Sequence, residues 1–416
     1  MNDAQPPSPA RQEVTRCGQA AKRAAPSLAA APDEAIDAAL AAMAALLTER
    51  AAPVLEANAA DMTRGEQQGL GRGLLDRLRL DEARLAASSS QLQLLAKVPF
   101  IPYGAARTPL PDGLFLTERQ IPIGVVGANF EARPAVTIDV ASQLLKSRNA
   151  GVLRTGAAAL GSATVLFDEV IAPALAGAGL DPDALQLVRT ADRAAATELV
   201  RHPELIPLVI LRGSGDSTRT LAAEAARAGV RTLAHADGGG VLYLDRAADP
   251  AEAASLIVQS LDRLGVCNRL NLLLICAAAW DDLLPVALAA FKEADVTASL
   301  PPHDHSLGLE WALQAGREAT VTVAPAADPV AAAQIANEHT SGLAASIATT
   351  DPEAARQFLA AYHGTAAFWN SSTRLLDGFK LRGVPETGIN IDHVPGPRGP
   401  VTFTDLTLRQ YVITPA

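Results

Sequence analysis

The chain has 416 residues, of which 49% are hydrophobic and 19% are charged, and its formal net charge is -10. This composition excludes a wholly disordered chain, and the excess of acidic residues argues against a protein that binds nucleic acid or an anionic membrane. The longest apolar run, Leu272–Trp280, is far shorter than the ~20 residues of a membrane span, so a membrane protein is not expected.

The first hundred residues are predicted to be helical, because their apolar side chains recur at helical spacing. Helices are expected over 32–50 and 81–96, and a turn followed by a helix is expected over 65–79. After Pro99 the pattern changes to short apolar strands with helices between them. These strands are expected over 121–130, 150–156, 185–190 and 205–215. Such an alternation predicts a parallel α/β sheet, in which ligands gather at the carboxyl ends of the strands.

A similar alternation resumes beyond a junction near His235–Gly240, which indicates two α/β domains. The strands of the second domain are expected over 240–245, 270–276, 320–324, 346–350 and 365–372. The tail from Val401 to Ile413 roughly alternates apolar and polar side chains and is predicted to be an edge strand.

Of the three cysteines, Cys267 is the candidate for chemistry. It lies between an expected helix and an expected strand, where backbone N–H groups can stabilise a thiolate nucleophile. The alternative, from spacing alone, is a small buried hydrophobic residue. Cys276 is expected to pack within a strand, and Cys17 is expected in a mobile N-terminal arm. The N-terminus lacks a secretory signal and the cysteines are too few for a disulfide framework, so a cytoplasmic location is expected.

Cationic side chains recur at expected strand ends and helix starts, namely at Arg133, Lys146, Arg154, Arg212 and Arg374. On an acidic chain this placement suits a ligand that carries phosphate, although ordinary surface charge is the alternative for each residue. The turn RGSGDS at 212–217 resembles a phosphate-binding turn but matches neither G-x-G-x-x-G nor a P-loop. Glu386 is a candidate for positioning a ligand hydroxyl. His303 and His305 are expected to be solvent-exposed, and no metal site is expected.

Several segments together resemble the gamma-glutamyl phosphate reductases (glutamate-5-semialdehyde dehydrogenases), a family of the aldehyde dehydrogenase superfamily. They are LEANAADM (55–62), PIGVVGANFEARPAVTIDVASQLLKSRNAGVLRTG (122–156), HADGG (235–239), VCN (266–268), NSSTRLLDG (370–378), PETGINID (385–392) and RQYVI (409–413). The resemblance implies an α/β fold of the aldehyde dehydrogenase type, with a Rossmann-like cofactor domain, an α/β catalytic domain and a small β oligomerisation flap.

The implied domains are 1–235 for the N-terminal helices and NADP binding, with part of the flap near 105–122, then 236–395 for catalysis and 396–416 as an oligomerisation strand. The implied reaction is the NADPH-dependent reduction of gamma-glutamyl phosphate to glutamate-5-semialdehyde in proline biosynthesis, through a cysteine thioester. A homo-oligomer is expected, and the upstream kinase is a candidate partner. No metal, nucleic acid or membrane partner is expected.

The resemblance also implies roles for individual residues. The implied catalytic residues are Cys267 and Asn268. The implied contacts to the cofactor are Lys146, Arg154, Gly213, Ser214 and Glu386. The implied contacts to the substrate are Arg133, Asn370 and Arg374. The stretch at 235–239 lacks the Glu with which hydrolytic aldehyde dehydrogenases activate water, and this absence fits a reductase that excludes water.

The sequence also departs from the family pattern at several positions. Ala135 stands where the family has Asn, Asn271 where it has Glu, and Val241 where it has His, and Leu343 lies in a more apolar version of another segment. These changes predict a substrate pocket that is more apolar than in the family. Two alternatives therefore stay open. One is a diverged paralogue that reduces another acyl phosphate or thioester in a specialised pathway, and the other is a catalytically idle homologue that acts as an oligomeric partner.

Overall fold

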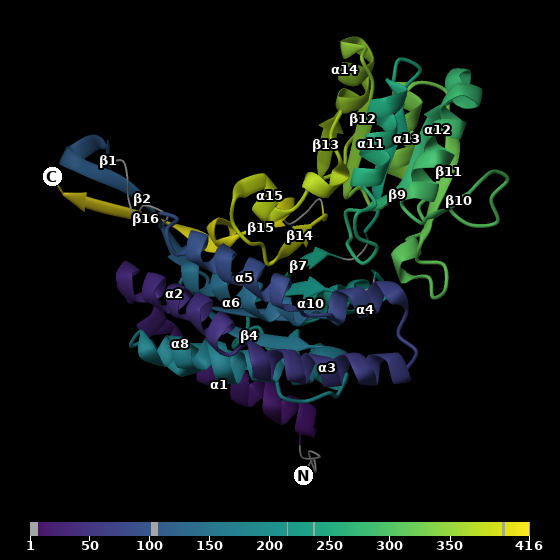
Figure 1. The fold of residues 1–416 in the computed structure, drawn as a ribbon. Coiled ribbons are helices and arrows are strands. Elements are labelled where there is room, and N and C mark those ends of the chain that lie inside the picture. Colours follow the sequence, from purple (N-terminus) through teal and green to yellow (C-terminus); the bar gives the residue numbers. More distant parts are fainter. Residues whose placement is uncertain (1–6, 101–106, 214, 236–237, 393–395, 416) are drawn as a thin grey trace, which may run out of the picture.

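The computed structural model describes residues 7–100, 107–213, 215–235, 238–392 and 396–415. The larger body contains a five-stranded parallel sheet with the order β5-β4-β3-β6-β7 (Figure 1). Its strands are β3 Val125–Phe130, β4 Ala150–Thr155, β5 Leu185–Leu187, β6 Leu208–Arg212 and β7 Arg231–His235. The chain builds outward from β3 to β5 and then crosses back to β6, so the direction of growth reverses between β3 and β6. Ligands of open α/β sheets bind at the carboxyl ends of the strands beside such a reversal.

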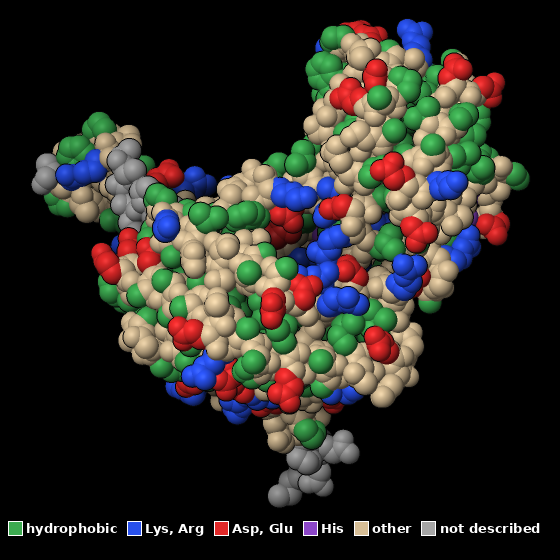
Figure 2. All heavy atoms as spheres, in the orientation of Figure 1, with side chains coloured by type: hydrophobic (Ala, Val, Ile, Leu, Met, Phe, Trp, Pro, Cys, Tyr) green, Lys and Arg blue, Asp and Glu red, His purple; other side chains and the backbone are tan. Residues whose placement is uncertain are grey.

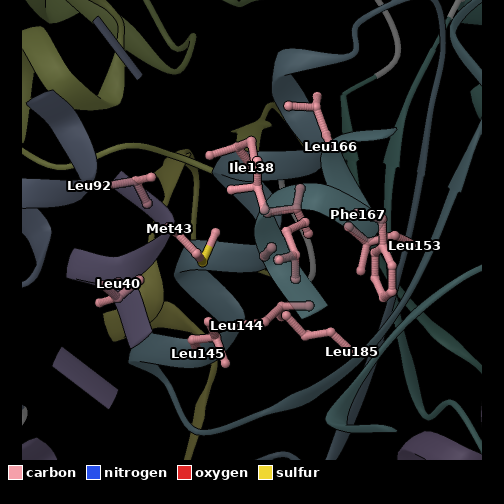
Figure 3. Packing of buried hydrophobic residues seen from close by; sticks show 14 of the residues in the cluster. Leu40, Met43, Leu92, Ile138, Leu144, Leu145, Leu153, Leu166, Phe167 and Leu185 are labelled. Carbon is pink, nitrogen blue, oxygen red and sulfur yellow. The ribbon is translucent and has the colours of Figure 1, made fainter. Parts of the chain in front are cut away.

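Helices cover both faces of this sheet. They are α1 Pro9–Ala29, α2 Asp33–Glu49, α3 Ala51–Gln67, α4 Arg72–Leu78, α5 Glu82–Leu95, α6 Ala135–Lys146, α7 Leu160–Leu166, α8 Ala172–Gly177, α9 Ala194–Leu199 and α10 Gly215–Ala228. Leu40 and Met43 of α2, Leu92 of α5 and Ile138 of α6 share one core with Leu153 of β4 (Figure 3). A second core joins α1, α9 and α10 to the other face. The helices predicted over 32–50 and 81–96 are confirmed as α2 and α5.

The N-terminal segment differs from its expectation. Residues 9–29 form helix α1, and Cys17 is fully buried against the sheet, so the prediction of a mobile arm is wrong. The buried positions Ala10, Val14, Cys17 and Ala21 follow the period of a helix, but they are small and lie among charged residues. The apolar stripe is therefore narrow, and it is the contact with β4 and β5 that stabilises the helix.

One helical stretch, Ala157–Gly177, has the length and hydropathy of a membrane span, and half of its apolar window is buried inside the protein. The bent pair α2 and α3 passes the same test when taken together. Leu166 and Phe167 from the first stretch and Leu40 and Met43 from α2 all lie in the core shown in Figure 3. Packing within the protein therefore accounts for their apolar character.

The second body holds a six-stranded parallel sheet with the order β10-β11-β9-β8-β12-β13. Its strands are β8 Gly240–Leu244, β9 Leu270–Cys276, β10 Thr297–Ser299, β11 Thr320–Ala326, β12 Ala344–Ala348 and β13 Ala366–Trp369. Helices α11 Pro250–Gln259 and α12 Trp280–Glu293 cover one face, and α13 Pro329–His339 and α14 Pro352–Ala361 cover the other. The strands predicted in this half are present, and Cys276 is buried in β9 as expected.

A three-stranded antiparallel sheet projects from the body and carries the C-terminal end (Figure 1). It consists of β1 Arg107–Pro109, β2 Leu114–Pro122 and β16 Thr407–Pro415, and a short pair, β14 Gly388–Asn390 and β15 Gly399–Val401, precedes it. The edge strand predicted over 401–413 is confirmed from Thr407 onward as β16, whereas Val401 belongs to β15 and 403–405 form a short 3-10 turn. The α/β fold of the aldehyde dehydrogenase type, with its Rossmann-like part and β flap, is likewise confirmed. The exact domain limits stay a prediction, because 236–237 and 393–395 lie outside the described residues.

Candidate active site

The two large sheets meet end to end around Cys267. The five-stranded sheet presents the carboxyl ends of β3 and β6, whereas the six-stranded sheet presents the amino ends of β8 and β9. The expectation that ligands gather at carboxyl ends therefore describes only the first sheet. A cavity of about 280 Å³ lies between them, and Figure 2 shows Lys and Arg side chains gathered in the hollow between the two bodies.

Cys267 lies in the loop between α11 and β9 and is half-buried. Its carbonyl oxygen accepts a hydrogen bond from the Gly239 N–H at 2.6 Å. A Cβ at Gly238 would lie 2.8 Å from the same oxygen, so this approach requires glycine. Burial alone would raise the pKa of the Cys267 thiol, but interaction with His235 and the positive charges of Arg133 and Arg212 lower it to about 6. The thiolate is thus the main form at neutral pH.

His235 ends strand β7 and is buried beside Cys267. Its Nδ1 lies 2.7 Å from the carbonyl oxygen of Ile389, and a carbonyl can only accept, so Nδ1 carries a hydrogen. Nε2 is buried and has no hydrogen-bond partner within the described part of the chain. Burial lowers the pKa of His235, but the Cys267 thiolate outweighs this effect and the pKa is raised. The ring therefore acts on Cys267 chiefly as a neighbouring positive charge.

Arginine side chains dominate the wall of the cavity. They are Arg77, Arg79, Arg84, Arg133, Arg212, Arg263 and Arg374. Val241 lies in a core of the second body and does not line the cavity, whereas Leu343 belongs to the small core against which Cys267 packs. Arginines thus dominate this cavity, and a pocket that is more apolar than in the family stays a prediction.

Most of these arginines are engaged with protein groups. Arg84 and Arg263 pair with Asp76 at 2.6 and 3.0 Å, and Arg77 donates to the Gly265 carbonyl at 2.6 Å. Arg79 is exposed to solvent, whereas Arg133 and Arg212 are half-buried and neither guanidinium has a hydrogen-bond or ion-pair partner among the described residues. Nη1 of Arg212 is buried and has no hydrogen-bond partner among these residues.

Burial and the neighbouring charges of Arg77 and Arg212 lower the pKa of Arg133 to about 9. Two half-buried cations that have no partner in the described part of the chain therefore favour the binding of an anionic ligand beside Cys267.

Three acidic side chains also line the cavity: Asp139 on α6, Asp377 and Glu386. Burial, together with the charges of Asp377 and Cys267, raises the pKa of Glu386 to about 8 despite the opposing effect of Arg212, and its carboxylate accepts a hydrogen bond from the Gly378 N–H. Burial also raises the pKa of Asp139 to about 7, despite the opposing charge of Arg212.

The aldehyde dehydrogenase family model matches residues 4–308. Gamma-glutamyl phosphate reductases from Clavibacter michiganensis and Moorella thermoacetica are 36% and 34% identical over 96% of this chain, which covers 94% and 97% of their own lengths. The chain belongs to the gamma-glutamyl phosphate reductase family of aldehyde dehydrogenases. The crystal structure of gamma-glutamyl phosphate reductase from Thermotoga maritima has the same fold, with a TM-score of 0.83, 24% identity and coverage of 97% of this chain and 98% of that one.

An acetylating aldehyde dehydrogenase from Geobacillus thermoglucosidasius also shares the fold, with a TM-score of 0.75, 15% identity and coverage of 97% and 96% of the two chains. Membership of the family makes this protein an oxidoreductase that acts on an aldehyde. It also implies a nicotinamide cofactor, and the five-stranded sheet offers the crevice that dinucleotides use.

The residues predicted to contact the cofactor fall into two groups. Arg154 is the next-to-last residue of β4 and donates to Asn129 Oδ1 at 3.1 Å, while its Nε is buried without a partner among the described residues. Gly213 follows β6, and a Cβ there would lie 3.1 Å from Glu131. Ser214 lies outside the described residues. Glu386 lines the cavity beside these strand ends.

Lys146 does not lie in this site. Its side chain is fully buried, its Nζ donates to Asp37 Oδ1 at 2.7 Å, and it sits 3.8 Å from the centre of the Phe100 ring. Burial lowers the pKa of Lys146, and Asp37 counters this effect. The lysine thus fixes α6 to α2, and we exclude it from the proposed cofactor site. The sequence pattern grouped Lys146 with cations at strand ends and helix starts, but it is the last residue of α6, and its position there does not show in which direction its side chain points.

Of the three other predicted residues, Asn268 and Arg374 line the cavity but are held by hydrogen bonds within the protein, and Asn370 lies outside the cavity. Asn268 donates to the Leu376 carbonyl at 2.7 Å and accepts a hydrogen bond from Arg374, which also bonds Asp262 at 2.5 Å. This network fixes the loop that follows β13. Asn370 exchanges hydrogen bonds with the backbone of Thr349 and lines a neighbouring pocket, not the cavity of Cys267. Neither amide is therefore free to stabilise a reacting oxygen.

The family departures are mostly structural. Asn271 is buried, donates to the Leu309 carbonyl at 2.8 Å and accepts from the Trp311 N–H at 3.1 Å. Only Ala135, at the start of α6, lines the cavity, so the substitution of Ala for Asn is the departure that reaches the site.

No group of three or more metal-ligand side chains lies together in the described ranges. His305 bonds Ser299 at 2.8 Å and meets the Trp311 ring edge to face, and both His303 and His305 are half-buried rather than solvent-exposed.

Two residues of the site carried too weak a sequence signal to be assigned roles. Asp139 falls one helical turn after Ala135 on α6, within the segment that matched the family. His235 was visible only as the first residue of HADGG. In both cases the helical period or the strand end indicated where the side chain lies. The residue that it faces across the cavity, however, is distant in sequence.

Proposed function

We propose that this protein reduces gamma-glutamyl phosphate to glutamate-5-semialdehyde, with NADPH as the reductant and Cys267 as the nucleophile. The observation that carries the proposal is the position of Cys267, whose pKa is about 6, beside two arginines, Arg133 and Arg212, that have no anionic partner among the residues that the structure describes. An acyl phosphate supplies both the electrophilic carbon and that anion. The name of the relatives from Clavibacter and Moorella supports the same substrate.

The first step is attack of the Cys267 thiolate on the acyl carbon. The C–S bond forms, the bond from carbon to the phosphate oxygen breaks, and phosphate leaves with the electron pair. Arg133 and Arg212 stabilise the negative charge on the acyl oxygen and on the leaving phosphate, which is the largest kind of electrostatic contribution in such reactions. His235 keeps the sulfur ionised before attack, because its positive charge lies beside it.

The bound nicotinamide cofactor supplies the hydride that reduces the thioester. The chain's own part in this half-reaction is to hold the reaction partners and to release the product. The C–S bond then breaks, the aldehyde forms, Cys267 leaves as a thiolate, and one proton from solvent ends on the released phosphate. A thiolate with a low pKa is a good leaving group, so His235, Arg133 and Arg212 assist this step as well.

We place the cofactor at the reversal between β3 and β6. Gly213, Arg154 and the strand ends around Glu131 would hold its phosphates. Glu386 would accept a hydrogen bond from a hydroxyl group of the nicotinamide ribose. The buried Nε of Arg154, which has no partner in the described part of the chain, supports an anion there. Ser214 remains a predicted contact. The proposed preference for NADPH over NADH is tested by comparing the kcat/KM values of the two cofactors.

The proposal is tested by running the reaction backwards. Glutamate-5-semialdehyde, phosphate and NADP⁺ are mixed with the protein, and the absorbance of reduced cofactor is followed. Phosphate-dependent reduction of NADP⁺ that is lost in Cys267→Ala is the expected result. A flat trace with folded protein would overturn the assignment and would direct the assay to other aldehydes.

The second candidate function is a diverged reductase for another acyl phosphate or thioester. Ala135 favours it, because it removes an amide from the wall of the cavity. A catalytically idle partner is less well supported, because such a protein has no need to retain a thiol of low pKa beside unpaired arginines. Aldehyde profiling in the same assay separates the two enzymes.

We propose in addition that the protein forms a homo-oligomer through the sheet of β1, β2 and β16. Leu408, Tyr411 and Ile413 of β16 are 50%, 57% and 58% exposed, which is unusual for large apolar side chains on a projecting sheet edge. Light scattering of the full chain and of Tyr411→Glu tests this. A cytoplasmic location and contact with the upstream kinase remain predictions.

A further inference from the structure

We infer that Asp139 binds the α-ammonium group of the substrate, so that the cavity selects an acyl phosphate derived from an amino acid. This inference rests on the proposed function, and it names the residue that recognises the part of the substrate remote from the reacting carbon. Cys267, Arg133 and Arg212 account for the acyl phosphate itself but give no reason to prefer an amino acid over a simple dicarboxylic acid.

Asp139 is the cavity acid that is not engaged by the protein. Among the described residues, its carboxylate has no hydrogen-bond or ion-pair partner. The other two acids are occupied, since Glu386 accepts the Gly378 N–H and Asp377 caps α15 (Gly378–Arg382) by accepting from the Phe379 and Lys380 N–H groups at 3.1 and 3.2 Å. A half-buried carboxylate without a partner lowers the stability of the fold unless a ligand pairs with it.

The position of Asp139 also suits this role. Ala135, Val136 and Asp139 face the cavity from the first turns of α6, opposite the loop that carries Cys267. In a glutamyl group the α-nitrogen is four bonds from the acyl carbon, a reach on the order of 5 Å. A substrate bound to Cys267 can therefore present its ammonium group to another wall of the same cavity of about 280 Å³.

The unpaired charges of the cavity complement those of an amino-acid acyl phosphate. Such a substrate carries two anionic groups, the phosphate and the α-carboxylate, and one cationic group. Among the described residues, the cavity offers two half-buried guanidinium groups without partners, on Arg133 and Arg212, besides the solvent-exposed Arg79, and one half-buried carboxylate without a partner, on Asp139. Asp139 is near enough to both arginines to interact with their charges but forms no ion pair with either. It is thus available to a ligand.

The test compares two aldehydes in the reverse reaction. Open-chain glutamate-5-semialdehyde carries the α-ammonium group, and 5-oxopentanoate has the same carbon chain and carboxylate without it. The wild-type protein should show a kcat/KM about 10- to 100-fold higher for the amino substrate, the range expected for a charge-assisted hydrogen bond. Asp139→Asn keeps the shape of the side chain and removes its charge, so it should abolish most of this preference while changing kcat/KM for 5-oxopentanoate little.

Asp377→Asn is the matched control. It removes one negative charge from the same cavity and retains a side chain that caps a helix well, so the ratio of the two substrates should stay at its wild-type value. An equal loss on both substrates in Asp139→Asn, or an unchanged preference, would overturn the inference. A wild-type protein that uses both aldehydes equally would overturn it and leave the reductase intact. Activity on neither aldehyde would overturn the proposed function and this inference with it.

Discussion

The Nδ1 atom of His235 lies 2.7 Å from the carbonyl oxygen of Ile389, so a residue at the end of β7 is oriented by the short strand β14. This bond decides which nitrogen carries the hydrogen and turns Nε2 inward, where Cys267 is the titratable group that most affects the ring. The histidine occupies the stretch in which hydrolytic relatives would carry a water-activating Glu. In place of that Glu, this protein therefore has a positively charged histidine beside the nucleophile.

His235→Gln is expected to slow alkylation of Cys267 at low pH. The wild-type thiol, whose pKa is lowered to about 6, is ionised above that pH, so its reaction with iodoacetamide should be half-maximal near pH 6. Without the positive charge of the ring the pKa moves back towards its ordinary value, and the rate at pH 6 should fall at least ~10-fold. Mass spectrometry of the labelled protein over pH 5–9 measures this.

His235→Asn is the companion variant, because an amide nitrogen at that position can still donate to the Ile389 carbonyl. It should behave like His235→Gln if charge is the cause. Cys17 is the internal control. Its burial and the nearby Glu13 raise its pKa to about 12, so it should stay unlabelled while the protein is folded. Unchanged alkylation profiles in both variants would contradict the role given to His235.

Arg212→Lys is expected to weaken the use of phosphate. A lysine keeps the charge but loses the planar guanidinium, which can form two parallel hydrogen bonds with one phosphate. The kcat/KM for phosphate in the reverse reaction should therefore fall by ~10²-fold. Arg374→Lys is the contrast, since Arg374 is bonded to Asp262 and Asn268. That variant should lower the melting temperature more than it changes the response to phosphate. The reverse pattern in the two variants would contradict the assignment of Arg212.

Glu386→Gln is expected to stabilise the protein at high pH. The pKa of Glu386 is raised to about 8, so the folded protein holds this proton between pH ~4.5 and 8 while the unfolded chain does not. Each rise in pH through that window therefore lowers the free energy of unfolding of the wild type. The neutral amide removes this loss.

Calorimetry should accordingly show a higher melting temperature for Glu386→Gln at pH 9 and a smaller difference at pH 5. Asp377→Asn serves as a comparison, because it removes a neighbouring carboxylate that caps a helix. A Glu386→Gln variant that is less stable than wild type at pH 9 would contradict a raised pKa for Glu386, because it would mean that the fold stabilises the ionised carboxylate.

Much of the architecture follows from the sequence because it rests on local pattern. The apolar runs VVGANF and AGVLRT are buried on both faces and become β3 and β4, and the apolar periodicity of 32–50 becomes α2. Cys267 could be singled out by its place between two elements. Helix α1 could not be predicted, because its buried stripe consists of small residues and is stabilised by contacts with distant strands.

The residues that line the cavity could not be predicted from the sequence, for a different reason. Which arginines remain unpaired depends on partners far away in sequence, such as Asp262 for Arg374 and Asp76 for Arg263. Lys146 and Arg154 gave the same sequence signal, yet one amine is bonded to Asp37 and only the other residue lies at a strand end of the crevice. Charge pattern finds the candidates, and tertiary pairing decides among them.

Asn271→Glu, which restores the residue expected from the family resemblance, is predicted to destabilise this protein. The Asn271 amide is buried and donates to the Leu309 carbonyl, and a carboxylate cannot donate and would be charged at neutral pH. The loss should be ~1–3 kcal/mol in the free energy of unfolding, measured by urea denaturation. Asn337→Glu is the matched control, because Asn337 also donates to a carbonyl and accepts from an N–H, but it is half exposed and should lose less. An Asn271→Glu variant as stable as wild type would mean that the loop around Trp311 can rearrange to satisfy the acid.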